Sequence, residues 1–299
     1  MIIPLTIARV PISNAFTWYR NAWTLLKAQP LILFLATSWV LLSLMMLASF
    51  PFIGAVASSF LTPVLAFGMA DICQKVRTNQ PANPLHVFAG IFGANRKNLF
   101  TLGVFYATVA LGCLLLTQLI DGGELMRMAM GVANTSGIDA SSIDPTLLAQ
   151  ELANDPVAFI KKYPIILALL TFQISNILIS SLFTYAPMFI GWQNANPNQA
   201  VALSLISIGR NFLSIGLAGL ITLLTLFGFT CIATILVHLL PAVGVFTAML
   251  LALLNFTFIY AITYTSYYGI LSTSLNNSVK ASVAAAIEKD QHNDNLDNL

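Results

Sequence analysis

Residues 213–237 read LSIGLAGLITLLTLFGFTCIATILV, and this unbroken apolar run decides the fold class. It holds no charged residue, and it exceeds the about 20 apolar residues that a helix needs to cross a bilayer. Five other stretches are mostly apolar over a similar length. The sequence therefore predicts an all-α membrane bundle of six transmembrane helices, expected at 31–50, 52–72, 99–119, 164–190, 213–237 and 242–271.

The composition supports lipid as the solvent of this chain. Hydrophobic residues make up 58% of the sequence and charged residues 8%, against about 25% charged in an average globular protein. A net charge of +2 is too small for a nucleic-acid-binding surface, so no nucleic acid partner is expected. We expect residues 1–271 to form a single transmembrane domain and residues 272–299 a cytoplasmic tail.

The distribution of Lys and Arg predicts the orientation of the chain. Ten of the 13 basic residues flank the predicted spans on the side of both termini, and three lie in the long loop 120–163 on the other side. Cytoplasmic loops of membrane proteins carry the excess of Lys and Arg. The pattern therefore predicts a multi-pass protein of a bacterial inner membrane with cytoplasmic N- and C-termini.

One unit recurs three times along the chain. An amphipathic segment with a basic end precedes a plain apolar span, and a second span rich in hydroxyls, Pro or Gly follows. The predicted fold thus has a threefold internal repeat, three interfacial amphipathic helices, and second helices that line the middle of the bundle. The interfacial helices either anchor the bundle or form a platform for lipids or partners. The candidate lipid-interface residues are Trp18, Trp23, Lys27, Arg96, Lys97 and Arg210.

The loop 120–163 is too long for a simple turn. Acid–proline pairs at Asp144-Pro145 and Asp155-Pro156 predict short helices at 145–153 and 156–162. This loop is a spacer, a lid or a docking site for a membrane or periplasmic protein partner. In the tail, residues 276–289 are expected to continue as a short helix.

The spans carry almost no charge but much uncharged polarity. Two polar stripes at helical spacing stand out, one on span four and one on span six. They consist of Asn176, Ser180 and Thr184, and of Tyr260, Thr263, Tyr264 and Tyr267. These stripes either form interhelical hydrogen bonds or line a polar pathway or headgroup site between the two spans.

Several short motifs together resemble an uncharacterised, mainly proteobacterial family of polytopic inner-membrane proteins. They are Ala15-Phe16-Thr17-Trp18, Lys27-Ala28-Gln29-Pro30, Pro51-Phe52-Ile53-Gly54, Thr62-Pro63, His86-Val87-Phe88-Ala89-Gly90, Asp121-Gly122-Gly123 and Tyr185-Ala186-Pro187. More distantly, the chain is similar to the membrane domain attached to some glycerophosphodiester phosphodiesterases. Members of the family tend to end the last helix with an Arg-Asp pair, where this chain has Tyr268-Gly269.

The sequence contains no catalytic template such as HExxH, GxSxG or a phosphate-binding GK[ST] loop. No metal or cofactor is expected, since the three cysteines lack CxxC spacing. We therefore expect a non-enzymatic membrane protein that contacts membrane lipids and scaffolds, assembles or regulates partners. The alternative is a transporter or lipid-handling protein that uses the polar pathway of spans four and six.

Overall fold

The computed structural model describes residues 7–50, 53–129, 150, 153–155, 158–159 and 162–296. The predicted helices at 145–153 and 156–162 lie for the most part outside these residues. Within the described part, the chain is helical and contains no strand, which confirms the all-α prediction.

Six helices of the described part are long and apolar enough to cross a membrane, as predicted. The fourth span consists of α9 and α10, and the sixth is the first part of α13. The helices of these spans are α2 (Pro30–Ala48), α3 (Ile53–Arg77), α5 (Arg96–Asp121), α9 (Pro164–Phe183), α10 (Ala186–Gln193), α12 (Phe212–Leu239) and α13 (Pro241–Leu296).

Prolines begin several of these helices. Pro30, Pro164 and Pro241 are the first residues of α2, α9 and α13. A proline at this position costs no hydrogen bond, because the first amide groups of a helix have no acceptor within it, and its fixed φ suits a helix. The predicted starts at 31, 164 and 242 therefore fall within one residue of the observed ones.

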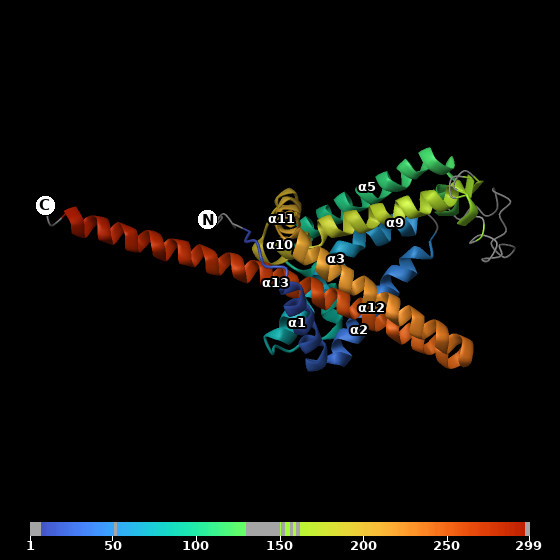
Figure 1. Ribbon diagram of the computed structural model, residues 1–299, viewed down its shortest axis with the longest axis horizontal. Coiled ribbons are helices and arrows are strands. Elements are labelled where there is room, and N and C mark those ends of the chain that lie inside the picture. Colours follow the sequence, from blue (N-terminus) through green and yellow to red (C-terminus); the bar gives the residue numbers. More distant parts are fainter. Residues whose placement is uncertain are drawn as a thin grey trace.

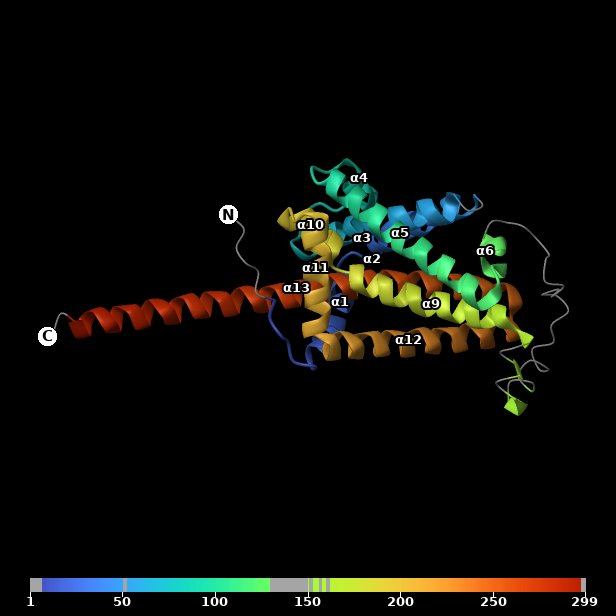
Figure 2. The ribbon, with the colours of Figure 1, turned by 90° about the horizontal axis from the view of Figure 1, so that it is seen from above.

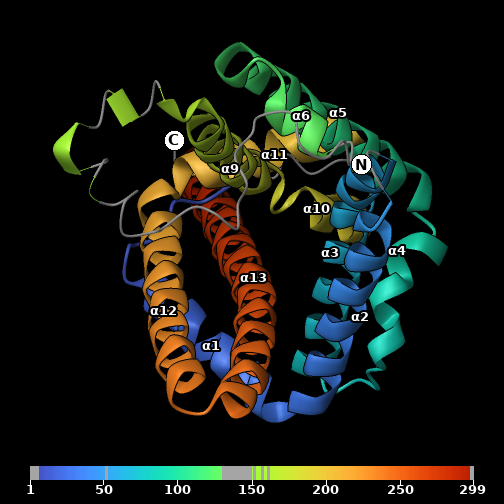
Figure 3. The same ribbon diagram turned by 90° about the vertical axis from the view of Figure 1, so that its right-hand side faces the viewer.

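The spans pack in a series rather than as a closed ring (Figures 1 and 3). In this series α12 lies beside α13, α13 contacts α2 and α3, α3 packs against α5, and α5 packs against α9. The turns from α2 to α3 and from α12 to α13 share one end of the bundle, here called the distal end, on the right of Figure 1. The opposite end, where α2 and α12 begin, is called the proximal end.

The amphipathic segments lie at the proximal end (Figure 2). They are α1 (Asn14–Ala28), the 3₁₀ helix η1 (Pro84–Phe88) with the single turn α4 (Ala89–Phe92), and α11 (Pro197–Arg210). The first and third are full helices, whereas the second is short and breaks at Gly93. The threefold repeat itself stays a prediction.

The predicted boundary between bundle and tail is not a break in the helix. α13 continues without interruption from the sixth span to Leu296 and extends far beyond the bundle (Figure 1). Residues 276–289 therefore continue the helix of span six, as expected, and the helix extends past them to Leu296.

The Asp121-Gly122-Gly123 motif ends α5 and starts α6 (Glu124–Ala129). Gly122 has φ of +65°, a left-handed conformation that closes a helix and favours glycine. The Asp121 carboxylate then accepts hydrogen bonds from the amides of Gly123 at 2.9 Å and Leu125 at 2.7 Å. One carboxylate thus satisfies the first amides of the new helix.

Candidate functional site

The fourth span is broken inside its proximal half. α9 ends at Phe183 and α10 begins at Ala186, because Pro187 has no amide proton for a continuous helix. Ser204 of α11 repairs the break: its hydroxyl donates to the Leu182 carbonyl at 2.6 Å and accepts from the Tyr185 amide at 3.2 Å. A break at this depth requires such a partner, since lipid offers none.

This break brings α3, α10 and α13 together around one group of rings, which we call the aromatic junction. Trp192 of α10 is at its centre, with ring centroids of Phe67, Tyr264 and Tyr267 at 5.9, 6.1 and 5.6 Å. Phe189 and Tyr185 also pack against Tyr267. One helix from each of the three predicted units therefore meets at this point.

The hydroxyl groups of the junction are hydrogen-bonded across helices. The Tyr185 hydroxyl donates to the Ser266 hydroxyl at 2.8 Å, and the Tyr267 hydroxyl accepts from the Gln193 amide at 3.1 Å. Tyr264 donates to the Gln74 side-chain carbonyl. Each contact links two helices of the junction, so these polar groups stabilise the packing of the proximal half.

Arg77, at the end of α3, covers one edge of the junction. Its guanidinium carbon lies 3.5 Å from the centroid of the Tyr268 ring, a cation–π contact. The next residue, Gly269, faces Trp18, and a Cβ atom there would be 2.5 Å from the indole nitrogen. The family that the chain resembles tends to have an Arg-Asp pair at these two positions. Here the first position is Tyr268, whose ring stacks on Arg77, and the second is Gly269, where a side chain has no room.

The two predicted polar stripes lie in different surroundings. On α9, Ser180 hydrogen-bonds to Tyr106 of α5 at 2.8 Å, while Asn176 and Thr184 donate to carbonyls of their own helix. On α13, Tyr264 and Tyr267 belong to the aromatic junction, and Tyr260 and Thr263 are partly buried. Among the described residues, no hydrogen bond joins one stripe to the other.

Span four contacts α13 through Tyr185, Phe189, Trp192 and Gln193, none of which belongs to the predicted stripe. Pro187 was the available signal. A helix restarted at this proline presents a different face from a helix continued through it.

Trp18 is a correction to the predicted lipid interface, because its side chain is only 2% exposed. The buried face of α1 also includes Ala15 and Ala22, and Ala22 packs against Ala261 and Ile262 of α13. In contrast, Phe16 is 61% exposed. In a membrane, small residues let two helices pack closely, and large apolar residues can face lipid. The size of an apolar side chain therefore does not indicate which face of α1 is buried.

The other predicted interface residues have exposed side chains. Lys27 lies 5.4 Å from the centroid of the Trp23 ring, and Arg96 and Lys97 are the first residues of α5. Arg210 is exposed as well, and its guanidinium also donates to the Ile7 carbonyl at 2.6 Å.

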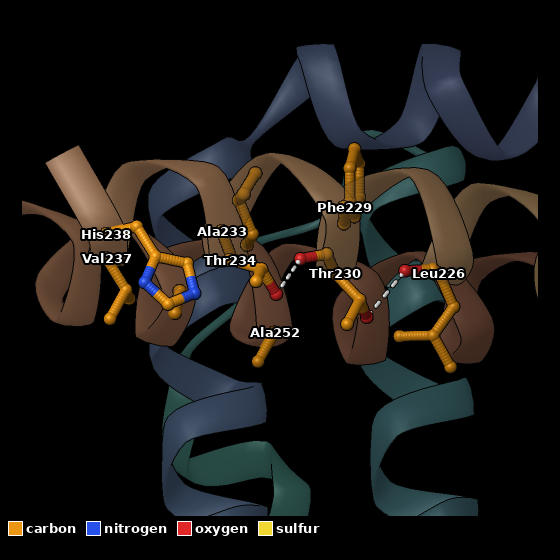
Figure 4. Close-up of a pocket in the computed structure, with 10 residues that line it drawn as sticks. Leu226, Phe229, Thr230, Ala233, Thr234, Val237, His238 and Ala252 are labelled. Carbon is orange, nitrogen blue, oxygen red and sulfur yellow. Dashed lines mark hydrogen bonds between the residues drawn. The ribbon is translucent and has the colours of Figure 1, made fainter. Parts of the chain in front are cut away.

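A second feature is a groove of about 360 Å³ along the distal half of the α12–α13 hairpin (Figure 4). Its lining is mostly apolar and includes large side chains, and small or polar ones lie among them: Ala233, Ala248 and Ala252 beside Thr230 and Thr234. Both threonine hydroxyls donate to carbonyls of their own helix, at 2.9 Å. His238 lies at the outer end of the same face, so one polar stripe borders the groove.

Within the part of the chain that the structure describes, no three His, Cys, Asp or Glu side chains gather in a way that could hold a metal ion.

The chain is similar to a curated protein of Burkholderia thailandensis named "Probable inner membrane protein". The two are 24% identical over 263 residues, which cover 82% of this chain and 90% of the relative. Six apolar helices and this relative together support a multi-pass location in the inner membrane. The predicted resemblance to an uncharacterised membrane family is consistent with this relative, whereas the similarity to phosphodiesterase membrane domains stays a prediction. No family model matches the chain. No solved structure matches it either.

Proposed function

We propose that this protein is a non-enzymatic inner-membrane protein that assembles or regulates membrane partners, and that the α12–α13 groove binds a transmembrane helix of such a partner. The observation that carries the proposal is the projecting distal half of this hairpin. Between Gly219 and Leu254, Gly244 is the one fully buried residue. The other residues of this segment are exposed or half-buried, so much of its surface is open to whatever surrounds the bundle.

The lining of the groove favours a helix over lipid chains as its occupant. Alanines allow two helix backbones to approach closely, and hydroxyl groups form hydrogen bonds between helices in a membrane. Thr230, Thr234 and His238 are all exposed on this face. Acyl chains offer no hydrogen-bond partner to these groups, whereas a helix with polar or small residues does.

Photo-crosslinking in native membranes tests this proposal. A photoreactive residue at position 234 is expected to capture a discrete protein, whereas one at Ile235 is not. Ile235 is a matched control because it is 58% exposed at the same depth but absent from the groove lining. Substitution A252F fills the groove from an exposed position and should reduce the capture at 234 by about tenfold, since each helix contact is worth on the order of 1 kcal/mol.

Equal capture at 234 and 235, or capture of lipid alone at both, would contradict partner binding at the groove. An adduct with twice the mass of this chain would identify the occupant as a second copy and not as a different protein.

The alternative function is transport or lipid handling along spans four and six. It has less support, because the hydroxyls of Tyr185 and Tyr267 are hydrogen-bonded inside the packed junction and those of Ser180 and Thr184 have partners on α5 and α9.

We also propose that the proximal end and both termini face the cytoplasm. The excess of Lys and Arg on that side supports this orientation. Alkaline phosphatase joined after Leu296 is expected to be inactive in intact cells, and the same enzyme inserted in the 130–149 segment to be active. A reporter with the reverse pattern of activity would show the opposite orientation.

A further inference from the structure

We infer that a pocket between the N-terminal segment and the start of α12 binds the headgroup of an anionic phospholipid. The pocket has a volume of about 520 Å³. Residues 9–12 form one wall and residues 209–214 the other. In Figure 2 the N-terminal segment passes beside the corner where α11 meets α12. This site is separate from the aromatic junction and from the hairpin groove.

Hydrogen bonds fix the two walls relative to each other. Asn211 accepts from the Val10 amide at 2.7 Å and donates to the Ala8 carbonyl at 3.1 Å. Ser214 donates to the carbonyls of Val10 and Pro11 at 3.2 Å. The Ala8 amide donates to the Ser274 hydroxyl at 2.8 Å. The extended N-terminal segment is thus held on three helices, and the pocket is preformed.

Two guanidinium groups line the pocket. Arg9 and Arg210 are both exposed, and neither takes part in an ion pair among the described residues. Arg210 uses one nitrogen for the Ile7 carbonyl and retains its other donors. No acidic residue contributes to the lining. Two guanidinium groups that retain donors, with no carboxylate beside them, match a phosphate ester, which guanidinium groups bind with two parallel hydrogen bonds.

The apolar residues of the lining point to a lipid as the source of the phosphate. Ile12, Phe212 and Leu213 line the same pocket and are 48%, 68% and 55% exposed. Phe212 is the first residue of a membrane span, so the pocket lies where headgroups meet acyl chains. A phospholipid satisfies both parts of this surface, with its phosphate at the arginines and its first methylenes against Phe212 and Leu213.

Native mass spectrometry of the full-length protein in detergent tests this inference, with phosphatidylglycerol and phosphatidylcholine as probes. The wild type should retain phosphatidylglycerol in preference to phosphatidylcholine. Substitution R9Q is expected to weaken this binding about fivefold, and R9Q with R210Q on the order of twentyfold. R9Q is the decisive variant, since Arg210 also holds the Ile7 carbonyl. Thermal unfolding of each variant establishes that the fold is intact.

R20Q is the matched control, because Arg20 is an exposed arginine on α1 and does not line the pocket. Unchanged binding by R20Q, with the loss in R9Q, supports the site. Equal binding by R9Q and the wild type, or equal losses in R9Q and R20Q, would overturn it. Displacement of phosphatidylglycerol by millimolar inorganic phosphate would also overturn it, since the pocket would then bind the free anion.

Discussion

Alanine in place of Gly68 is expected to destabilise the protein by about 3 kcal/mol, and larger side chains to prevent folding. A Cβ atom on Gly68 would lie 1.8 Å from the carbonyl oxygen of Val87 and 2.4 Å from its carbonyl carbon. These are backbone atoms of η1, which packs against both α2 and α3, so no side-chain rotation relieves the clash. Thermal unfolding of the purified protein should show a midpoint about 10 °C lower.

G216A is the matched control for this prediction. Gly216 is also inside a membrane span, but a Cβ atom there would meet nothing within 4 Å. Alanine is a better helix former than glycine, so this variant should be as stable as the wild type or slightly more stable. If G68A and G216A unfold at the same temperature, the close contact between α3 and η1 does not exist.

Loss of the Trp18 side chain is expected to cost about 3–5 kcal/mol, the second large effect. Trp18 is among the largest fully enclosed side chains of the described residues, and its ring lies against Gly269. Its carbonyl also accepts a hydrogen bond from Thr265 at 3.1 Å, so α1 and α13 adjoin closely at this point. In W18A the cavity left between them should lower both the unfolding temperature and the yield of folded protein.

W23A tests the same helix one turn further on. Trp23 is 47% exposed and contacts Lys27 and Phe258. Its truncation should cost about 1 kcal/mol or less, as is typical of an exposed cation–π contact. A larger loss in W23A than in W18A would reverse the assignment of the buried face of α1.

The spans could be predicted from the sequence because their length follows from the thickness of the bilayer and their starts from proline. The faces of the helices could not. In water Phe16 and Trp23 would also be buried, whereas here both are exposed and the small residues Ala15 and Ala22 lie on the buried face. Lipid removes the penalty for exposing Phe16, so the periodicity of apolar residues no longer indicates the packing face.

Breaks in the helices are the second reason why the contacts in the structure differ from those predicted from the sequence. The stripe of Asn176, Ser180 and Thr184 lies on α9 and its C-cap, and the chain restarts as α10 directly after it. The hydrogen bonds to α13 come from Tyr185 and Gln193, at the restart and beyond it. The pairing of Arg9 with Arg210 could not be predicted either, because the two residues are about 200 positions apart in the sequence. Only the folded N-terminal segment brings them into the same pocket.

The packing of α1 also bears on how the protein is made. Its partners are Ala218, which accepts from Tyr19, and Thr265, which donates to the Trp18 carbonyl, at separations of 199 and 247 residues. A ribosome adds about 5–20 residues per second, so Trp18 is synthesised roughly 12 to 50 s before Thr265. During this interval α1 has its smaller contacts with α2 and α3 but lacks α13, the helix against which it packs most extensively. Closure of the proximal end is thus a late step that depends on insertion of the final hairpin, and a ribosome arrested before that hairpin holds a chain whose first helix is only partly packed.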